Sequence, residues 1–431
     1  MKQILIIIAA LVALSAQASD RHHHHSSSSE KKSSSRHKVT ITVSNPTDTP
    51  RSGEMVEVDS KAVQKKLKSE TFIVTDADGR EIPSQVTYDG KLIFQAAAPA
   101  SHSSKYYVTA GTPAKYEPQA YGRQFPERVD DIAWENDRVA FRCYGPALQK
   151  SGEKAWGYDI WNKRTSKMVV ENRYAGELDS DIKRAMERLR ELGRDDAADD
   201  LYNMVSYHVD HGNGMDCYKV GPTLGCGTAA IVASGKICYP RCYKSFVVLD
   251  NGPLRFTVRL VYGVEQIDGM NITETRILSL DAGSQLNRVM VSYEGLNKTE
   301  DVAVGIVVHN ENPNAYVLNT ASHYMLYEDL GDPNQYKEKY RAAQNKDFGR
   351  IYVGAVVPFA TQMKFQAEEG LPGATGHILA STQCDSALPL VYYFGSGWSR
   401  NPETNFQSIA DWEAYLNQFA AHVEKPLKVK M

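Results

Sequence analysis

The chain has 431 residues, with 52 acidic residues against 49 lysines and arginines and a formal net charge of −3. Charges of both signs are mixed along the sequence, which excludes nucleic acid and anionic membrane surfaces as expected partners. The length exceeds the usual limit of about 250–300 residues for one hydrophobic core, so one large core or two smaller cores are expected.

The first residues have the pattern of a secretory signal peptide. Lys2 provides a positive start, residues 4–14 form a short apolar run, and Ala16 and Ala18 are the small residues that a signal peptidase reads. We therefore predict a signal peptide over residues 1–18, cleaved after Ala18, and a periplasmic or secreted protein. The apolar run is too short to be a permanent membrane span, and no later stretch predicts one.

Residues 19–37 are rich in histidine, serine and lysine and include four consecutive histidines, 22–25. Such a segment cannot bury apolar area, so we predict a disordered leader. Metal scavenging is the alternative role for this segment.

Residues 38–112 predict an N-terminal β region. Short β-rich runs alternate with turn residues, and Asp89-Gly90 has the composition of a hairpin turn. The pattern is typical of a small β-sandwich or of one sheet of a larger sandwich. The predicted strands cover residues 39–43, 54–58, 72–75, 82–87, 91–94 and 106–110.

Residues 113–431 predict the main domain. A highly charged segment, 179–205, has apolar residues at helical spacing and predicts a helical excursion that Asp179 could cap. A last helix is expected over 408–423. We predict a mostly β fold, a large antiparallel two-sheet sandwich such as a mutarotase-like supersandwich, with peripheral helices. The predicted long strands cover residues 246–249, 255–264, 275–280, 287–293, 302–309, 351–358, 377–380 and 389–395.

Four of the six cysteines, Cys217, Cys226, Cys238 and Cys242, lie in one short segment. In an oxidising compartment this spacing favours disulfides over zinc, because the paired C-x2-C units of a zinc ribbon are missing. The connectivity stays open.

The segment 130–144 concentrates charged and aromatic side chains. Residues 130–138 are interpreted as a loop that contains Trp134 and Glu135, and the strand after it carries Arg142 and Tyr144. Alternate residues of a strand share a face, so these last two side chains are expected to project together. A guanidinium can grip a carboxylate with two hydrogen bonds, which makes this a candidate substrate-contact segment. An ordinary turn with ion pairs is the alternative.

The segment 207–221 interrupts the apolar periodicity with histidine, aspartate, tyrosine and glycine. Histidine transfers protons near neutral pH, and tyrosine can deliver one when its pKa is lowered, so His208 and Tyr218 are candidate catalytic residues. Asp210 and His211 are candidate substrate contacts. A structural turn and a metal site are the alternatives, although the HExxH pattern and a calcium loop are both missing. We predict no metal ligand and no cofactor, with a metal requirement left open.

Three further residues are candidates for substrate binding. Arg255 enters a strand directly after the turn Asn251-Gly252-Pro253. Tyr392 and Trp398 flank a glycine-containing stretch and could stack on a sugar ring, or they could be core aromatics.

Several stretches carry a family resemblance. They are Glu127 to Asp137, Phe141 to Pro146, Gly157 to Trp161, Tyr207 to Tyr218, Asn251 to Arg255, Tyr392 to Trp398, and the run that begins at Pro426. With these motifs the chain resembles, over nearly its whole length, a bacterial family catalogued as domain of unknown function four-eight-six-one. The resemblance implies a place among proteins that degrade uronate-containing polysaccharides, and dehydration of a uronic acid at the non-reducing end of an oligosaccharide. It assigns no catalytic residue.

Three hypotheses about function follow, each with an oligosaccharide as the partner and an unknown oligomeric state. The first is β-elimination at a terminal uronate, with Arg142, alone or together with Arg255, as the carboxylate clamp, His208 as the base, and Tyr218 or Tyr144 as the acid. The second is a glycoside hydrolase that uses a carboxylate pair, Glu135 and Asp210, separated by about 5–5.5 Å for retention or about 6.5–9.5 Å for inversion. The third is a non-catalytic carbohydrate-binding protein. Neither the glycan nor its linkage is predicted.

Overall fold

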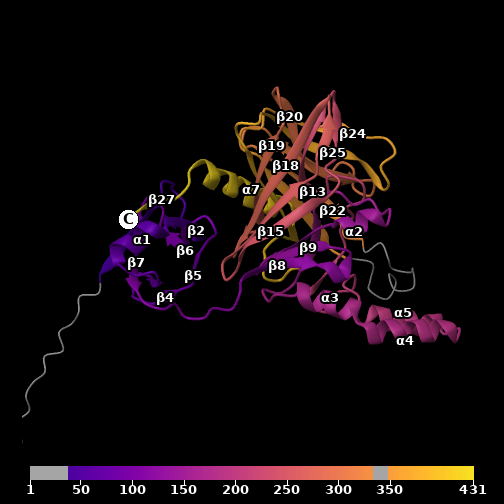
Figure 1. The fold of residues 1–431 in the computed structure, drawn as a ribbon, viewed down its shortest axis with the longest axis horizontal. Helices are drawn as coiled ribbons and strands as arrows, with labels where there is room; N and C mark the ends of the chain where they lie inside the picture. The colour runs from indigo at the N-terminus through magenta and orange to yellow at the C-terminus, as the bar shows by residue number, and fades with distance from the viewer. Residues whose placement is uncertain (1–36, 333–347) are drawn as a thin grey trace, which may run out of the picture. The chain divides into compact units, whose positions relative to one another are not determined.

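The computed structural model describes residues 37–332 and 348–431 (Figure 1). The predicted signal peptide, and the predicted leader apart from His37, lie outside the described residues. The mostly β class predicted from the sequence is confirmed, because the strands assemble into several antiparallel sheets. Within the described stretches, no helix has the length and apolar character needed to cross a membrane.

Two sheets surround a small core at the beginning of the described chain. Their strands are β1 Lys38–Ser44, β2 Arg51–Asp59, β3 Phe72–Thr75, β4 Glu81–Ile82, β5 Ser84–Val86, β6 Lys91–Ala98, β7 Ser103–Ala110 and β27 Lys428–Lys430. The larger sheet has the order β27-β1-β7-β3-β4 and the smaller one β2-β6-β5. Apolar residues of β1, β6 and β7 form the core with helix α1 Ser60–Leu67. The strand β27 pairs with β1 across the predicted domain boundary at residue 112, which stays a prediction.

A third sheet carries the first motif segment. Its strands are β8 Ala120–Phe125, β9 Asp131–Asn136, β10 Ala140–Cys143, β11 Asp159–Lys163 and β12 Gly214–Asp216, in the order β12-β11-β10-β9-β8. The interpretation of residues 130–138 as a loop is wrong, because all six residues of β9 are buried in the sheet. The ionised side chains of β9 are tolerated there because each has polar partners from distant segments, as Glu135 has in Lys163.

Two large sheets form the rest. The first has the order β14-β13-β20-β25-β24, with β13 Cys226–Ala233, β14 Lys236–Cys238, β20 Glu300–His309, β24 Gln362–Ala367 and β25 Ala374–Cys384. The strands of the second are β15 Tyr243–Asn251, β16 Arg255–Tyr262, β17 Glu265–Ile267, β18 Met270–Asp281, β19 Leu286–Glu294, β21 Tyr316–Asn319, β22 Tyr324–Leu330, β23 Arg350–Val356 and β26 Leu390–Trp398. Its order is β15-β16-β18-β19-β26-β23-β22-β21, and β17 pairs with β18.

The main core lies between these two sheets. Along β18 every second residue is buried, which is the pattern of a strand with one face on a core. The inward residues of β18 and β19 share one apolar cluster with those of β13, β20 and β25. This arrangement agrees with the predicted two-sheet sandwich. Two of the inward residues of β18, Glu274 and Arg276, are charged.

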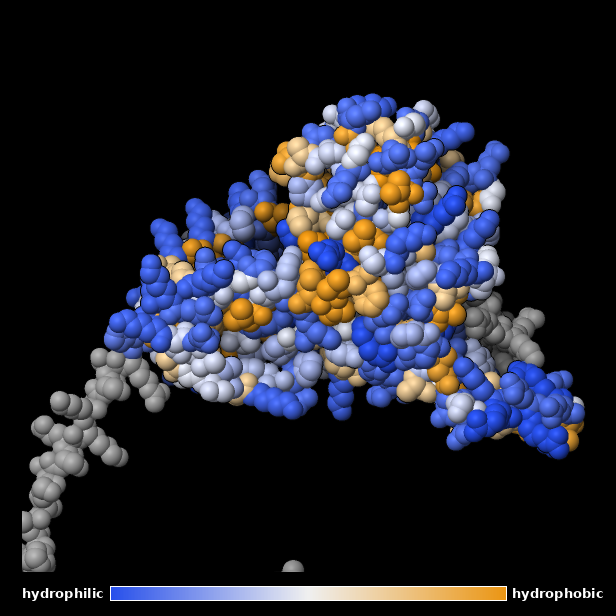
Figure 2. All heavy atoms as spheres, viewed as in Figure 1, coloured by the Kyte–Doolittle hydropathy of each residue, from blue (hydrophilic) through white to orange (hydrophobic). Residues whose placement is uncertain are grey.

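Helices lie in the connections and near the end of the chain. They are the 3-10 turn η1 Pro126–Arg128, α2 Pro146–Lys150, α3 Val170–Leu178, α4 Ser180–Glu191, α5 Asp195–Asn203 and α7 Ile409–Glu424. Asp179 caps α4, as predicted, by accepting the N–H groups of Asp181 and Ile182. No residue of α4 is buried, and hydrophilic residues dominate the surface of α4 and α5 (Figure 2).

The predicted disulfides are not present, because all six cysteines are free thiols. Cys217, directly after β12, and Cys226 of β13 are buried, whereas Cys238 and Cys242 are only half-buried near β14 and β15. The four cysteines of this short segment therefore lie on or beside different elements of the fold.

Candidate functional site

The candidate site is built on three neighbouring strands. Arg142 of β10 lies directly opposite Asp159 of β11, and Asp216 of β12 is opposite Trp161 of β11. Side chains of adjacent strands on one face of a sheet touch one another, so this register places a guanidinium between two carboxylates. We call Arg142, Tyr144, Asp159 and Asp216 the Arg142 cluster.

Hydrogen bonds connect every member of the Arg142 cluster. Arg142 donates from Nε to Asp159 Oδ2 at 2.8 Å, and from Nη2 to Asp216 Oδ2 at 2.9 Å and to the Tyr144 hydroxyl at 3.1 Å. The Tyr144 hydroxyl donates to Asp159 Oδ2 at 3.0 Å. The nitrogen Nη1 of Arg142 is buried and has no hydrogen-bond partner among the described residues. The cluster is a closed ionic group with one unused donor nitrogen.

Burial dominates the electrostatics of the cluster. It raises the pKa of Asp159 and of Asp216, against the lowering effect of the Arg142 guanidinium on both. Burial also raises the pKa of the neighbouring Asp131 to about 6. Burial outweighs the neighbouring guanidinium groups, so a proton is retained on these carboxylates closer to neutral pH than on ordinary aspartates.

His208 lies at the outer edge of the cluster. Its Nδ1 is 3.1 Å from the backbone carbonyl oxygen of Asp216 and 3.7 Å from Asp216 Oδ2. A carbonyl oxygen only accepts, so Nδ1 carries the proton and Nε2 holds the lone pair in the neutral ring. Burial lowers the pKa of His208, which favours this neutral form. The His208 side chain is 13% exposed, against 3% for Asp216. It is a fixed imidazole with its basic nitrogen turned away from the carbonyl.

Aromatic rings hold the imidazole in place. The ring of Tyr207 lies 4.7 Å from that of His208 and 4.6 Å from that of Trp161, between centroids. The guanidinium carbon of Arg142 lies 4.9 Å from the centre of the Trp161 ring. Arg128 of η1, whose side chain is 24% exposed, donates from Nε to the Tyr207 hydroxyl at 3.4 Å. A second, more accessible guanidinium therefore belongs to the same group.

Asp210 and His211 shape the loop beside His208. The Asp210 Oδ1 accepts the N–H groups of Gly212 and Gly214, at 2.9 and 3.0 Å, and its Oδ2 pairs with Arg164 at 2.9 Å. Gly214 has a φ of 100°, and a Cβ there would lie 2.1 Å from the Asn162 carbonyl oxygen, so only glycine fits. His211 Nε2 bonds to the Ser206 carbonyl at 3.0 Å. The two histidines thus bind different carbonyl groups.

Tyr218 belongs to a neighbouring buried group. Its backbone N–H bonds to Asp216, but its hydroxyl is buried without a hydrogen-bond partner in the described part of the chain. Its ring lies 5.7 Å from that of His309, between centroids, and His309 Nδ1 is 2.9 Å from Asp329 Oδ2. Burial raises the pKa of the Tyr218 hydroxyl well above its ordinary value.

Two candidate residues of β9 are buried and already hydrogen-bonded to other groups of the chain. Trp134 lies opposite Phe141 in the strand register, on the face of the sheet that Arg142 does not occupy. The Nε1 of Trp134 donates to Asn287 Oδ1 at 2.8 Å. Glu135 accepts Lys163 Nζ at 2.7 Å and the first N–H groups of α3. Both residues are fully buried, so neither offers a surface to a sugar.

The other three candidates also lie apart from the Arg142 cluster. Arg255 pairs with Asp281 at 2.5 Å and with Glu57 at 2.7 Å. Tyr392 is fully buried, and Trp398 is buried with its Nε1 donating to the Phe348 carbonyl at 2.9 Å. Tyr392 and Trp398 are therefore core aromatic residues and do not form a platform on which a sugar ring could stack.

Sequence reasoning did not select Asp159, Asp216 or Arg128. Asp159 stands in the short aromatic stretch Gly157 to Trp161, and a carboxylate inside a buried strand is itself a signal, because it needs a charged partner. In the two described stretches, no three His, Cys, Asp or Glu side chains form a group that could hold a metal ion.

Comparisons with known proteins identify the family but no activity. A protein of Formosa agariphila, "Uncharacterized protein P7", is 25% identical over 427 residues, which cover 92% of this chain and 94% of that protein. Two Enterococcus faecalis structures, an alpha-mannosidase and a protein in glycosyl hydrolase family 38, give TM-scores of 0.46 and 0.43 at 8% identity over 91% of this chain. The chain spans only 46% and 47% of those two proteins. The family model "Domain of unknown function (DUF4861)" matches residues 43–429, so the chain belongs to the DUF4861 family, as its motifs predict.

Proposed function

We propose that this protein is a carbohydrate-active enzyme that acts on uronic-acid-containing oligosaccharides by β-elimination at a terminal uronate. The observation that carries the proposal is the state of His208, a neutral imidazole whose Nδ1 donates to a backbone carbonyl. Its lone pair on Nε2 is at the partly exposed edge of a buried ionic cluster. Ionisable groups with shifted pKa values that gather around such a base are typical of catalytic sites.

The chemistry needs a base and a cation. Nε2 of His208 takes the proton from C5 of the uronate, the electron pair forms the C4–C5 double bond, and the C4–O bond breaks. The departing oxygen leaves as water or as a sugar hydroxyl after it gains a proton. Negative charge develops on the uronate carboxylate as C5 loses its proton, so a nearby guanidinium lowers the barrier.

Two arginines are available for the carboxylate. Nη1 of Arg142 is the nitrogen of its guanidinium without a hydrogen bond, although the other nitrogens already bind Asp159 and Asp216. Arg128 is more exposed and reaches the Tyr207 hydroxyl beside His208. We propose Arg142 as the cation behind the site and Arg128 as the contact at its edge.

Tyr144 is the proposed proton donor for the departing oxygen. Its hydroxyl accepts from Arg142 and donates to Asp159, so it is held beside the cation. Burial raises its pKa well above the ordinary value, which is the opposite of the lowering expected from the sequence and keeps the hydroxyl protonated at neutral pH. Tyr218 is the less suitable donor because its ring packs against His309. The signal-peptide pattern supports a periplasmic or secreted location, which we propose as well.

The test is incubation of the purified protein with oligosaccharides that end in a uronate. Elimination produces a conjugated alkene, which is followed by ultraviolet absorbance and by the mass of the product. His208→Ala should lower kcat by about 10²–10⁴-fold. His422→Ala is the matched control, since His422 lies on α7 next to Glu54 and away from the cluster. Unchanged turnover in His208→Ala would remove this residue from the mechanism, and new reducing ends without absorbance would indicate hydrolysis.

A further inference from the structure

A pocket with a volume of about 320 Å³ opens beside β14, β17 and β18 and shares no residue with the Arg142 cluster or His208. We infer that this pocket binds a neutral sugar unit. Its volume is at the lower end of the range of small-ligand sites, which fits a single sugar ring. The inference is independent of the proposed elimination reaction. We call it the aromatic pocket, after Trp156 and Tyr239 at its side.

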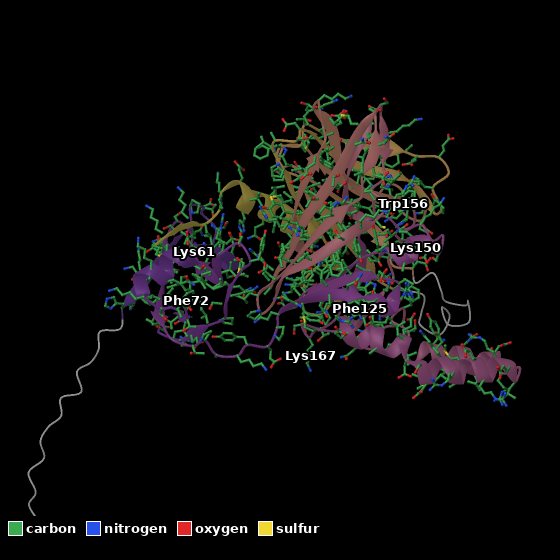
Figure 3. The ribbon with its side chains drawn as sticks, in the orientation of Figure 1. Lys61, Phe72, Phe125, Lys150, Trp156 and Lys167 are labelled. Carbon is green, nitrogen blue, oxygen red and sulfur yellow. The ribbon has the colours of Figure 1, made fainter. Side chains whose placement is uncertain are left out.

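Trp156 and Tyr239 form a fixed pair of rings. Their centroids are 4.9 Å apart with an angle of 44° between the planes. The Tyr239 hydroxyl donates to Glu368 at 2.5 Å, and the backbone N–H of Trp156 donates to the Gly221 carbonyl at 3.3 Å. Trp156 is labelled in Figure 3. The apolar C–H face of a sugar packs on such rings, and Ile237, which also lines the pocket, extends the apolar surface.

The polar groups of the pocket come from two adjacent strands. Glu274 of β18 and Tyr293 of β19 are directly opposite each other, and both line the pocket. The Tyr293 hydroxyl is buried and has no hydrogen-bond partner anywhere in residues 37–332 and 348–431. A buried polar atom without a partner is uncommon and is readily satisfied by a ligand. A sugar hydroxyl would donate to the Glu274 carboxylate and bond to Tyr293.

The charges of the pocket favour a neutral ligand over an acidic one. Its charged lining residues are Arg241, Glu265 and Glu274. The nearby Arg276 pairs with Glu274 through its Nε, so Arg241 and Glu265 are the remaining charges of the lining. A uronate would therefore find no excess of positive charge in the pocket, and its carboxylate would lie near those of Glu265 and Glu274. This preference is the opposite of the one proposed for the His208 site.

The test uses the tryptophan inside the pocket. The sequence has five tryptophans, all in the described residues, and Trp156 is the one that is not buried. The full chain is titrated with D-glucose, D-galactose and D-xylose, and separately with D-glucuronate. Intrinsic fluorescence and saturation-transfer NMR are recorded. At least one neutral sugar should give a saturable change, with affinity about tenfold or more above that for glucuronate, equivalent to about 1.4 kcal/mol.

Variants assign the binding to the pocket. Trp156→Ala should weaken binding by about tenfold or more, and Tyr293→Phe, which keeps the shape, by about threefold to tenfold. Tyr316→Ala is the control, because this half-buried ring stacks on Phe365 outside the pocket. His208→Ala should bind as the unchanged protein does, which separates this inference from the elimination reaction.

Three results would overturn the inference. One is the lack of a saturable response to all three neutral sugars. Another is binding of glucuronate as tight as that of the neutral sugars. The third is full binding in both Trp156→Ala and Tyr293→Phe, which would locate the bound sugar elsewhere on the chain.

Discussion

Two arginines of this protein are buried in similar polar surroundings but differ in the number of carboxylates with which they pair. Arg142 and Arg276 are both at most 4% exposed, and each pairs with acidic side chains and bonds to a tyrosine hydroxyl. Arg142 serves two carboxylates, those of Asp159 and Asp216. Arg276 serves one, that of Glu274, and its other nitrogens donate to the Tyr158 hydroxyl and the Ala229 carbonyl at 3.0 Å each.

A buried guanidinium with carboxylates and tyrosines is therefore not by itself a sign of catalysis. Next to Arg142 is His208, an imidazole that can take a proton. Next to Arg276 there is Glu274, whose carboxyl lines a pocket suited to binding. The ion pairing also differs, since Arg142 pairs with two carboxylates and Arg276 with one. Four predictions test this difference between the two arginines.

Removal of the two guanidinium groups should have unequal effects on stability. Arg142→Met leaves two buried carboxylates without a cation and should lower the free energy of unfolding by about 3–5 kcal/mol. Arg276→Met leaves one such carboxylate and should cost less. Urea unfolding followed by fluorescence measures both values. Arg188→Met on α4 is the control, because its ion pair with Glu191 is exposed and contributes little. Equal losses at both sites would contradict the charge comparison.

Asp131 should make stability depend on pH. Its folded pKa of about 6 is above the unfolded value of 3.8, so its contribution is complete below pH 3.8 and is lost as pH rises through about 6. Between about pH 4 and pH 7 the free energy of unfolding should fall, relative to Asp131→Asn, by roughly 2–3 kcal/mol. Parallel stability curves for the two proteins would show that burial does not raise the pKa of Asp131.

The pH profile of the proposed reaction should report the lowered pKa of His208. A protonated imidazole cannot take the C5 proton, so kcat/KM should fall about tenfold per pH unit on the acid side. Because burial lowers this pKa, the midpoint of the acid limb should lie below pH 6.5, the ordinary value. Initial rates across a pH series, with folding checked at each pH, give the midpoint. A midpoint above 6.5 would assign the limb to another group.

Loss of the Tyr144 or the Tyr158 hydroxyl should have the smallest of these effects, and the two losses of stability should differ slightly. Tyr144→Phe removes a hydroxyl that accepts from Arg142 and donates to Asp159, and should cost about 1–2 kcal/mol of stability. Tyr158→Phe removes a hydroxyl that accepts from Arg276 alone, and should cost about 1 kcal/mol. Thermal or urea unfolding of the two variants measures the difference. A larger loss at Tyr158 would contradict the ranking.

Local patterns account for the parts of the fold that the sequence predicts. The alternation along residues 275–280 corresponds to β18, where every second side chain is buried. The predicted last helix corresponds to α7, which begins after a capping box formed by Ser408 and Asp411. Hydrophobic period and capping residues are encoded within a few positions, so one sequence is enough to find them.

Pairing between distant segments accounts for what could not be predicted. Residues 130–138 contain five ionised side chains, and nothing nearby indicates that Asp131 and Glu135 would be buried. Their partners, such as Lys163, come from other strands. In the site, Arg142, Tyr144 and His208 do come together, because β11 lies between β10 and β12. Asp159 was missed because its importance depends on being opposite Arg142, and register is a property of the folded sheet.

The pairing of β27 with β1 has a consequence for biosynthesis. The register joins Thr42 to Lys430 and Ser44 to Lys428, so an outer strand of the first sheet is translated after every other described strand. Until the ribosome has made it, the outer side of β1 presents unpaired backbone groups that other chains could bind. A fragment that stops before residue 428 would keep that exposed edge permanently, and should be more prone to aggregate than the full chain.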